Sequence, residues 1–332
     1  MTSGLDLRRF VRRDTNILQL LGLTVLIFAA MSALNPEKFL RPYNFESLTF
    51  VAPELGLLSI AMMLAMLTGG IDLSVIGIAN LSAIVAGLFF HAAGGARGPG
   101  LINLPATTVA AGLTIALTTG LLAGAVNGLL IARVRITPIL ATIGTGQVYV
   151  GLSLVLTGGP AIVGFPALWD SIGNGTLAGV AVPLLLLLGI AGVVALVLTR
   201  TAFGIDLFLI GTSAKAAIFA GIRVGRATFL SYVATGLLAS VAGIILSGRT
   251  NAAKSDYGTS YLLQAVLIAV LGGTNPAGGR ASVLGVVIAL VALMLLSSGL
   301  QLMRFSNFLV DFIWGAFLLI VIAINALRNR RR

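Results

Sequence analysis

Charge and cysteine are what this sequence lacks. Only 9% of its 332 residues are charged and 58% are hydrophobic, whereas soluble domains carry roughly 25% charged residues. Because no soluble fold could cover so much apolar surface, a water-soluble globular protein is excluded. The absence of cysteine excludes disulfides, thiolate nucleophiles and cysteine-ligated metals. The single histidine, His91, argues against a histidine metal site.

Basic residues give the chain a net charge of +11, but they flank apolar runs and form no patch for nucleic acid. Four arginines precede the first apolar run, in segment 1–16, and four follow the last, in segment 328–332. Loops on the cytoplasmic side of a membrane carry an excess of Lys and Arg. We therefore expect both terminal segments to be cytoplasmic and expect no nucleic acid as a partner.

Residues 17–327 are expected to form one all-α transmembrane domain of about ten helices, some of them broken or re-entrant. The eighth apolar segment is too short to cross a bilayer at 1.5 Å per residue, so we interpret it as half of a broken element. Most of the 21 Lys and Arg residues then fall on the cytoplasmic side, which favours an even number of spans. The expected spans are 17–34, 48–68, 72–90, 106–131, 137–157, 181–199, 227–247, 262–272, 282–303 and 307–327.

Two glycine pairs interrupt the apolar segments, Gly69-Gly70 and Gly272-Gly273. Backbone breaks at membrane depth survive only inside protein or beside a water-filled path, and breaks in both halves of a chain are typical of transporters. Glycine-rich helix packing is the alternative explanation. Asp72 follows the first pair, where an ionised carboxylate costs at least ~2.5 kcal/mol. We interpret Asp72 chiefly as the cap of a new helix, with substrate contact as the alternative.

Other polar residues within the expected spans are candidates for a translocation pathway. Glu54 could face a cavity or lie near the membrane interface, and Asp311 could pair with Arg304 or line the pathway. Uncharged candidates can equally form hydrogen bonds between helices, worth about 0.6 kcal/mol on average. Among the uncharged candidates, we rank Gln147 and Asn307 first as residues that line the pathway. The uncharged candidates are Asn80, Asn127, Thr142, Gln147, Ser297 and Asn307.

The basic connection over 211–226 predicts a short helix lying parallel to the membrane. Thr212 or Ser213 can cap a helix over 214–220, and Gly221 can end it. The helix carries small residues, one lysine and Phe219. From these residues alone, anchoring to lipid headgroups is the simpler interpretation, and docking into a groove on a cytoplasmic partner is the alternative.

Three segments together resemble the permease subunits of bacterial ATP-binding-cassette (ABC) sugar importers of the ribose, xylose and arabinose type. They are Gly69-Gly70-Ile71-Asp72-Leu73-Ser74-Val75, Gly211 through Arg226, and Val270-Leu271-Gly272-Gly273-Thr274 followed by Gly278-Gly279. The resemblance extends from about residue 45 to the C-terminus. Lys215 departs from the family pattern, in which an acidic residue is common at this position, and the stretch 253–258 looks more like the rhamnose and autoinducer-2 branches.

The resemblance implies a type II ABC importer-like permease fold in the bacterial inner membrane. It also implies an identical or homologous second permease subunit, a cytoplasmic ABC ATPase and a periplasmic sugar-binding protein. The segment 211–226 would then be the coupling helix that docks on the ATPase. Its implied contact residues are Ser213, Ala216, Ala217, Phe219, Gly221, Ile222 and Arg226.

ATP chemistry is expected in the partner, so we expect no cofactor, metal or catalytic residue in this chain. Gly273 and Gly278 have the glycine spacing of a phosphate-binding loop, but Gly279 and Arg280 stand where Lys and Ser/Thr are required. An ion-coupled secondary transporter that uses Asp72 or Asp311 is the main alternative function. A membrane enzyme or structural subunit is a third.

Overall fold

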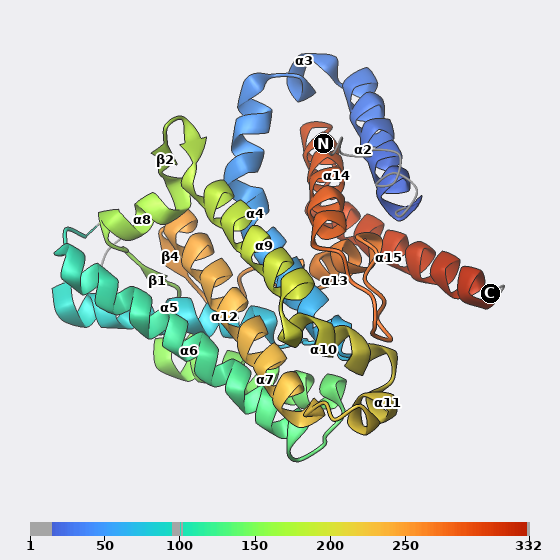
Figure 1. The fold of residues 1–332 in the computed structure, drawn as a ribbon. Coiled ribbons are helices and arrows are strands. Elements are labelled where there is room, and N and C mark those ends of the chain that lie inside the picture. The colour runs from blue at the N-terminus through green and yellow to red at the C-terminus, as the bar shows by residue number, and fades with distance from the viewer. Residues whose placement is uncertain (1–14, 95–99, 101, 331–332) are drawn as a thin grey trace, which may run out of the picture.

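The computed structural model describes residues 15–94, 100 and 102–330. The basic segments 1–14 and 331–332 lie outside this described part. Each of the ten expected apolar segments is helical, and the fold is an all-α membrane fold (Figure 1). The ten helices are α2 (Thr15–Leu34), α4 (Pro42–Leu67), α5 (Val75–Gly94), α6 (Ala106–Ala132), α7 (Pro138–Thr157), α9 (Val182–Arg200), α12 (Val224–Thr250), α13 (Tyr261–Leu271), α14 (Val283–Leu302) and α15 (Asn307–Arg330).

Eight helices of the described chain are long and apolar enough to cross a membrane, namely α2, α4, α5, α6, α7, α9, α12 and α14. Helix α13 has only 11 residues, as the short eighth segment predicted. Four shorter helices join the others: α3 (Pro36–Phe39), α8 (Ala167–Asn174), α10 (Ala202–Thr212) and α11 (Ala214–Phe219). Two-residue strands form two small antiparallel pairs, β1 (Ile162–Val163) with β4 (Ala252–Ala253) and β2 (Thr176–Leu177) with β3 (Val180–Ala181).

Helix α4 occupies the centre of the molecule. It packs against α9, α12, α13 and α14, and every residue from Pro53 to Leu67 is buried. A helix that is apolar on all sides is expected to be surrounded by others. Its N-terminal end points towards α3, whereas its C-terminal end points towards α11, at the opposite side of the molecule (Figure 1).

Some of the glycines allow close packing between helices, which is the alternative explanation given above for the glycine pairs. Helices α6 and α12 cross where Gly120 and Gly124 meet Gly236. A Cβ on Gly236 would lie within 2.8 Å of the Gly124 Cα and would collide with the Gly120 carbonyl oxygen. Small residues spaced by four on α6 therefore let the two backbones touch, as is typical of membrane helix pairs.

The predicted breaks lie at the predicted glycines. Gly69 ends α4 with a φ of +83° and Gly273 follows α13 with a φ of +94°, in the left-handed region that glycine adopts without steric cost. Gly70 and Gly272 are sites of close approach instead. A Cβ on Gly70 would collide with the Tyr232 hydroxyl, and one on Gly272 would lie 2.6 Å from the Val286 nitrogen.

The expected spans leave residues 200–226 as a connection, but the first half of this stretch forms the helix α10. Thr201 caps α10 by accepting a hydrogen bond from the Gly204 nitrogen at 3.2 Å. Leu207 and Ile210 of α10 are buried in the core. The helix was missed because its 11 residues are too few to read as a span, although its composition is as apolar as that of the spans.

Candidate functional site

Helix α11 forms as predicted, over Ala214–Phe219. Ser213 ends α10 and caps α11, its hydroxyl accepting a hydrogen bond from the Ala216 nitrogen at 3.2 Å. At the other end, the Gly221 nitrogen donates to the Ile218 oxygen and the Ile222 nitrogen to the Ala217 oxygen, both at 3.0 Å. This is the Schellman pattern, which requires the positive φ of +80° found at Gly221.

Most of the predicted contact residues of α11 face outwards. Phe219 is 93% exposed and the neighbouring Ile218 is 61% exposed, so two large apolar side chains project from the end of the helix. Ala217 differs, because it is buried in the core of its own chain and seats α11 there. Ile222 is half-buried. The exposed predicted residues are Ser213, Ala216, Phe219, Gly221 and Arg226.

The three segments that carry the family resemblance meet at one place, which we call the glycine junction (Gly69, Gly211, Gly278 and Gly279). The Gly279 nitrogen donates a hydrogen bond to the Leu67 oxygen at 3.1 Å. A Cβ on Gly211 would collide with the Leu67 oxygen and the Gly279 nitrogen, and a Cβ on Gly278 would lie 2.7 Å from the Gly211 oxygen and 3.0 Å from the Gly69 nitrogen. The ends of α4 and α10 and the turn before α14 are therefore in backbone contact.

Asp72 is fully buried and holds the start of α5. Its Oδ1 accepts hydrogen bonds from the Ser74 nitrogen at 3.0 Å and the Ser74 hydroxyl at 2.6 Å. Its Oδ2 accepts one from the Thr235 hydroxyl at 2.9 Å. Thr142 secures the same turn, accepting from the Leu73 nitrogen and donating to the Ile71 oxygen, both at 3.1 Å. Because α5 begins at Val75, Asp72 forms an Asx turn with Ser74 just before the helix and is not the N-cap that we predicted.

Asn80 and Asn127, two predicted pathway residues, bond to other parts of the chain. Asn127 donates to the Ser74 hydroxyl at 2.7 Å and accepts from the Thr145 hydroxyl at 2.6 Å. Asn80 donates to the Ser255 and Tyr257 oxygens at 3.0 and 2.9 Å. Both side chains are buried. In this structure they serve the structural alternative, as hydrogen bonds between segments.

Replacing Asp72 separates a structural role from a direct role in transport. Asp72→Ala removes the acceptor of three buried donor groups, so we expect a loss of about 1–3 kcal/mol of stability, read as a lower melting temperature in detergent. Asp256→Ala is the control, because Asp256 is 58% exposed and pairs with Lys254 at the surface. Asp72→Asn that abolishes uptake at unchanged melting temperature would contradict the structural role.

Sequence reasoning missed an ion pair inside the protein, between Glu54 and Arg249. Glu54 is 1% exposed. The Arg249 Nη2 lies 2.8 Å from Oε1 of Glu54 and its Nε lies 3.3 Å from Oε2. The Tyr261 hydroxyl also donates to Oε1, at 2.7 Å. These contacts tie α4, α12 and α13 together. The sequence feature that could have indicated this ion pair is Arg249, a single arginine near the end of an apolar span.

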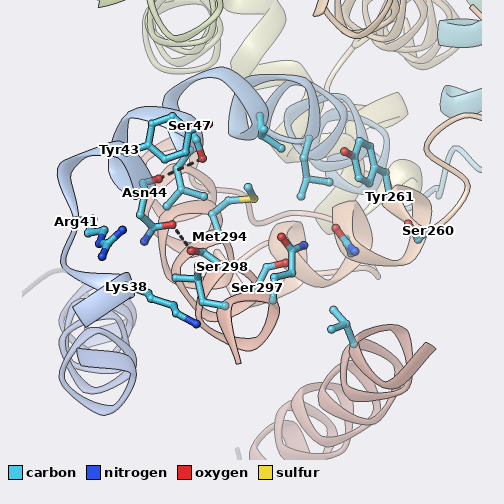
Figure 2. A pocket seen from close by; sticks show the side chains of 17 residues that line it. Lys38, Arg41, Tyr43, Asn44, Ser47, Ser260, Tyr261, Met294, Ser297 and Ser298 are labelled. Atoms are coloured by element: carbon cyan, nitrogen blue, oxygen red, sulfur yellow. Dashed lines mark hydrogen bonds between the residues drawn. The ribbon is translucent and has the colours of Figure 1, made fainter. Parts of the chain in front are cut away.

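A cavity of about 710 Å³ opens between the first half of α4, the start of α13 and the second half of α14. Figure 2 shows its side chains, with Asn44 and Ser298 joined by a hydrogen bond of 2.6 Å. Ser297, a predicted pathway residue, lines it. Its polar lining residues are Lys38, Arg41, Tyr43, Asn44, Ser47, Ser260, Tyr261, Gln264, Ser297, Ser298 and Gln301.

Of the two residues that we ranked first for the pathway, only Gln147 has a described side chain, and it is not among the lining residues. Gln147 is exposed on α7, away from the lining residues. Asn307 and Asp311 belong to the backbone of α15, and their side chains lie outside the described part of the structure. A pathway role for these three residues remains a prediction.

A family model described as "Branched-chain amino acid transport system / permease component" matches residues 44–322. The chain belongs to this permease family. The ribose import permease protein RbsC of Bacillus subtilis is 35% identical to the permease over 308 residues, which cover 92% of the chain and 91% of the relative. The autoinducer 2 import system permease protein LsrD of Escherichia coli is 31% identical over 312 residues, covering 92% and 90%.

Both relatives are import permeases, and they confirm the family resemblance that we inferred from the three sequence segments. The permease is a multi-pass membrane protein. No solved structure matches the chain.

Proposed function

We propose that the permease is the membrane subunit of an ATP-driven importer for a small sugar or sugar-like molecule. Its similarity to permeases for ribose and autoinducer 2 supports this substrate class. The observation that carries the proposal is α11, a capped helix that exposes Phe219 and is joined through Ser213 to the glycine junction. The exposed Phe219 of α11 can insert into a groove on a partner protein. The glycine junction links α11 to the membrane helices.

The proposal assigns partners to the permease. A cytoplasmic ABC ATPase, which binds ATP and Mg²⁺, docks on α11. A second permease subunit, identical or homologous, completes the translocation pathway, and a periplasmic binding protein delivers the solute. Both termini then lie in the cytoplasm of a bacterial cell, with the permease in the inner membrane. The permease itself is not an enzyme.

Contact between backbones at the glycine junction would couple motion of α11 to motion of the membrane helices. Only Thr212 and Ser213 separate Gly211 from α11. A displacement of α11 therefore acts on Gly211, which is in contact with the end of α4 through Leu67 and with the turn before α14 through Gly279. Because packed backbone offers no side chain to rotate away, the three segments move together. In this way ATP binding in the partner would alternate the pathway between its outward-facing and inward-facing states.

Phe219→Ala is expected to weaken binding of the ATPase by at least about 30-fold, because we propose Phe219 as the hot spot of this interface, and truncation of a hot spot costs about 2 kcal/mol or more. Binding of the purified ATPase to the permease in lipid nanodiscs measures this effect, and ATP-driven uptake should fall with it. Phe308→Ala is the matched control, since Phe308 is 88% exposed on α15. If Phe219 only anchors α11 to lipid, both variants will bind the ATPase equally.

A secondary transporter predicts a different response to energy sources. Uptake would continue without any ATPase and would collapse when an ionophore dissipates the ion gradient. Asp72 is poorly suited to an ion site, because its carboxylate already accepts three hydrogen bonds. Uptake by proteoliposomes, with and without the ATPase, distinguishes the two functions.

A further inference from the structure

We propose that the cavity between α4, α13 and α14 is a binding site for a neutral polyhydroxylated solute, built within a single permease chain. This inference rests on the proposed function and adds to it a location and a recognition chemistry. The volume of about 710 Å³ lies within the 300–1,000 Å³ typical of small-molecule sites. It can hold a monosaccharide together with some of its water.

Three side chains in the cavity have hydrogen-bonding capacity to spare. Gln264, Ser297 and Gln301 line it, and none of them bonds to another side chain or backbone group among the described residues. Each amide offers two donors and an acceptor, and the hydroxyl offers one donor and two acceptor sites. Polar groups left unpaired in a membrane protein are costly, so the cavity favours water or a hydroxylated solute.

The arrangement on the helices brings these groups to one wall. Ser297 and Gln301 are four residues apart on α14 and so share a face, and Gln264 comes from the neighbouring α13. Tyr261, one turn before Gln264, also lines the cavity, and its hydroxyl is held by Glu54, which is held in turn by Arg249. The aromatic ring of Tyr261 is therefore held in position at the cavity before any solute binds (Figure 2).

The charges around the cavity distinguish between substrate classes. Among the residues whose side chains the structure describes, Lys38 and Arg41 line the cavity and no Asp or Glu does. A branched-chain amino acid, the substrate class named in the family description, carries an ammonium group, for which a carboxylate is the strongest partner. A neutral sugar requires only donors and acceptors, which this lining provides. The described lining thus offers a polyol all the partners that it requires and offers an ammonium group no carboxylate.

The location of the cavity agrees with a role in receiving solute. Leu55 is its lining residue nearest to the C-terminal end of α4. At 1.5 Å per residue, the 12 residues from Leu55 to Leu67 place the cavity about 18 Å or more along α4 from the glycine junction. It therefore opens near the end of α4 opposite to α11, the side on which the proposed binding protein would deliver its solute.

The test is ATP-driven uptake by the complete complex of permease, ATPase and binding protein in proteoliposomes. The probes are D-ribose, L-rhamnose and xylitol, with L-leucine as the amino acid. We expect uptake of a polyol, reduced at least about tenfold by Gln264→Leu/Gln301→Leu. Thr114→Val, at an exposed polar position of α6 outside the cavity, is the control. Unchanged uptake by the double variant overturns the site and leaves the proposed function standing. Uptake of leucine alone, or of no probe, contradicts the proposed function as well.

Labelling provides a measurement that does not depend on turnover. The chain has no cysteine, so Ser297→Cys in the full-length permease gives a single thiol in the cavity. A membrane-impermeant maleimide should modify it, and the polyol that is transported should slow the reaction, whereas leucine should not. Ser59→Cys, at a fully buried position of α4, should stay unlabelled. A Ser297→Cys thiol that does not react, or that no polyol protects, overturns the proposal.

Discussion

Gly211→Ala is expected to reduce ATP-driven uptake at least about tenfold and to destabilise the permease by about 1–3 kcal/mol. The added methyl group would collide with the Leu67 oxygen and the Gly279 nitrogen. Both obstacles are backbone atoms, so no change of rotamer relieves the collision, and the ends of α4 and α10 must separate. Uptake by the reconstituted complex and melting temperature in detergent measure the two effects.

Gly225→Ala is the control for this prediction. Gly225 lies in the first turn of α12, on the same side of the molecule, and the nearest atom to a Cβ there is the Ala132 oxygen at 3.7 Å. Alanine in a helix is also more favourable than glycine. Equal uptake by the two variants would show that the glycine junction does not transmit force.

Arg249→Met is expected to cost about 3–5 kcal/mol of stability, because it leaves the Glu54 carboxylate buried without a cation. Glu54→Gln in the same chain should recover a large part of the loss, since the double variant carries no uncompensated charge. A double-mutant cycle on melting temperature or denaturant midpoint gives the coupling between the two residues.

Lys254→Met serves as the matched control for Arg249→Met. Lys254 also pairs with a carboxylate at 2.9 Å, that of Asp256, but both side chains are exposed, and such pairs contribute about 0–1 kcal/mol. Should Arg249→Met prove as mild as Lys254→Met, the Glu54 pair would have no role in holding α4, α12 and α13 together.

Local signals in the sequence were sufficient for the helices and their ends. Apolar runs located the ten segments, Ser213 and Gly221 delimited α11, and Gly69 and Gly273 marked the breaks where positive φ values occur. These features depend on neighbouring residues alone. Helix α10 was missed because a short apolar helix and an apolar connection have the same local composition.

Contacts between distant residues could not be read in the same way. Glu54 and Arg249 are 195 residues apart, and α4 is buried all round over its second half, so no amphipathic pattern reveals which way Glu54 points. The same limit applied to Asn80 and Asn127, whose buried partners lie on other segments. The described lining of the cavity comes from four separate stretches of the chain, 38–55, 260–264, 294–302 and Val310, and among the candidates with described side chains Ser297 alone belongs to it.

The two ends of α4 set different conditions for redesign of the protein. At the glycine junction the backbones touch, so almost no substitution there can be accommodated. At the cavity, side chains rather than backbone form the walls, and Gln264, Ser297 and Gln301 can be exchanged without moving a helix. If the cavity receives the solute, an altered range of imported solutes is accessible by changing one end of α4 while the surface that we propose for the ATPase is kept.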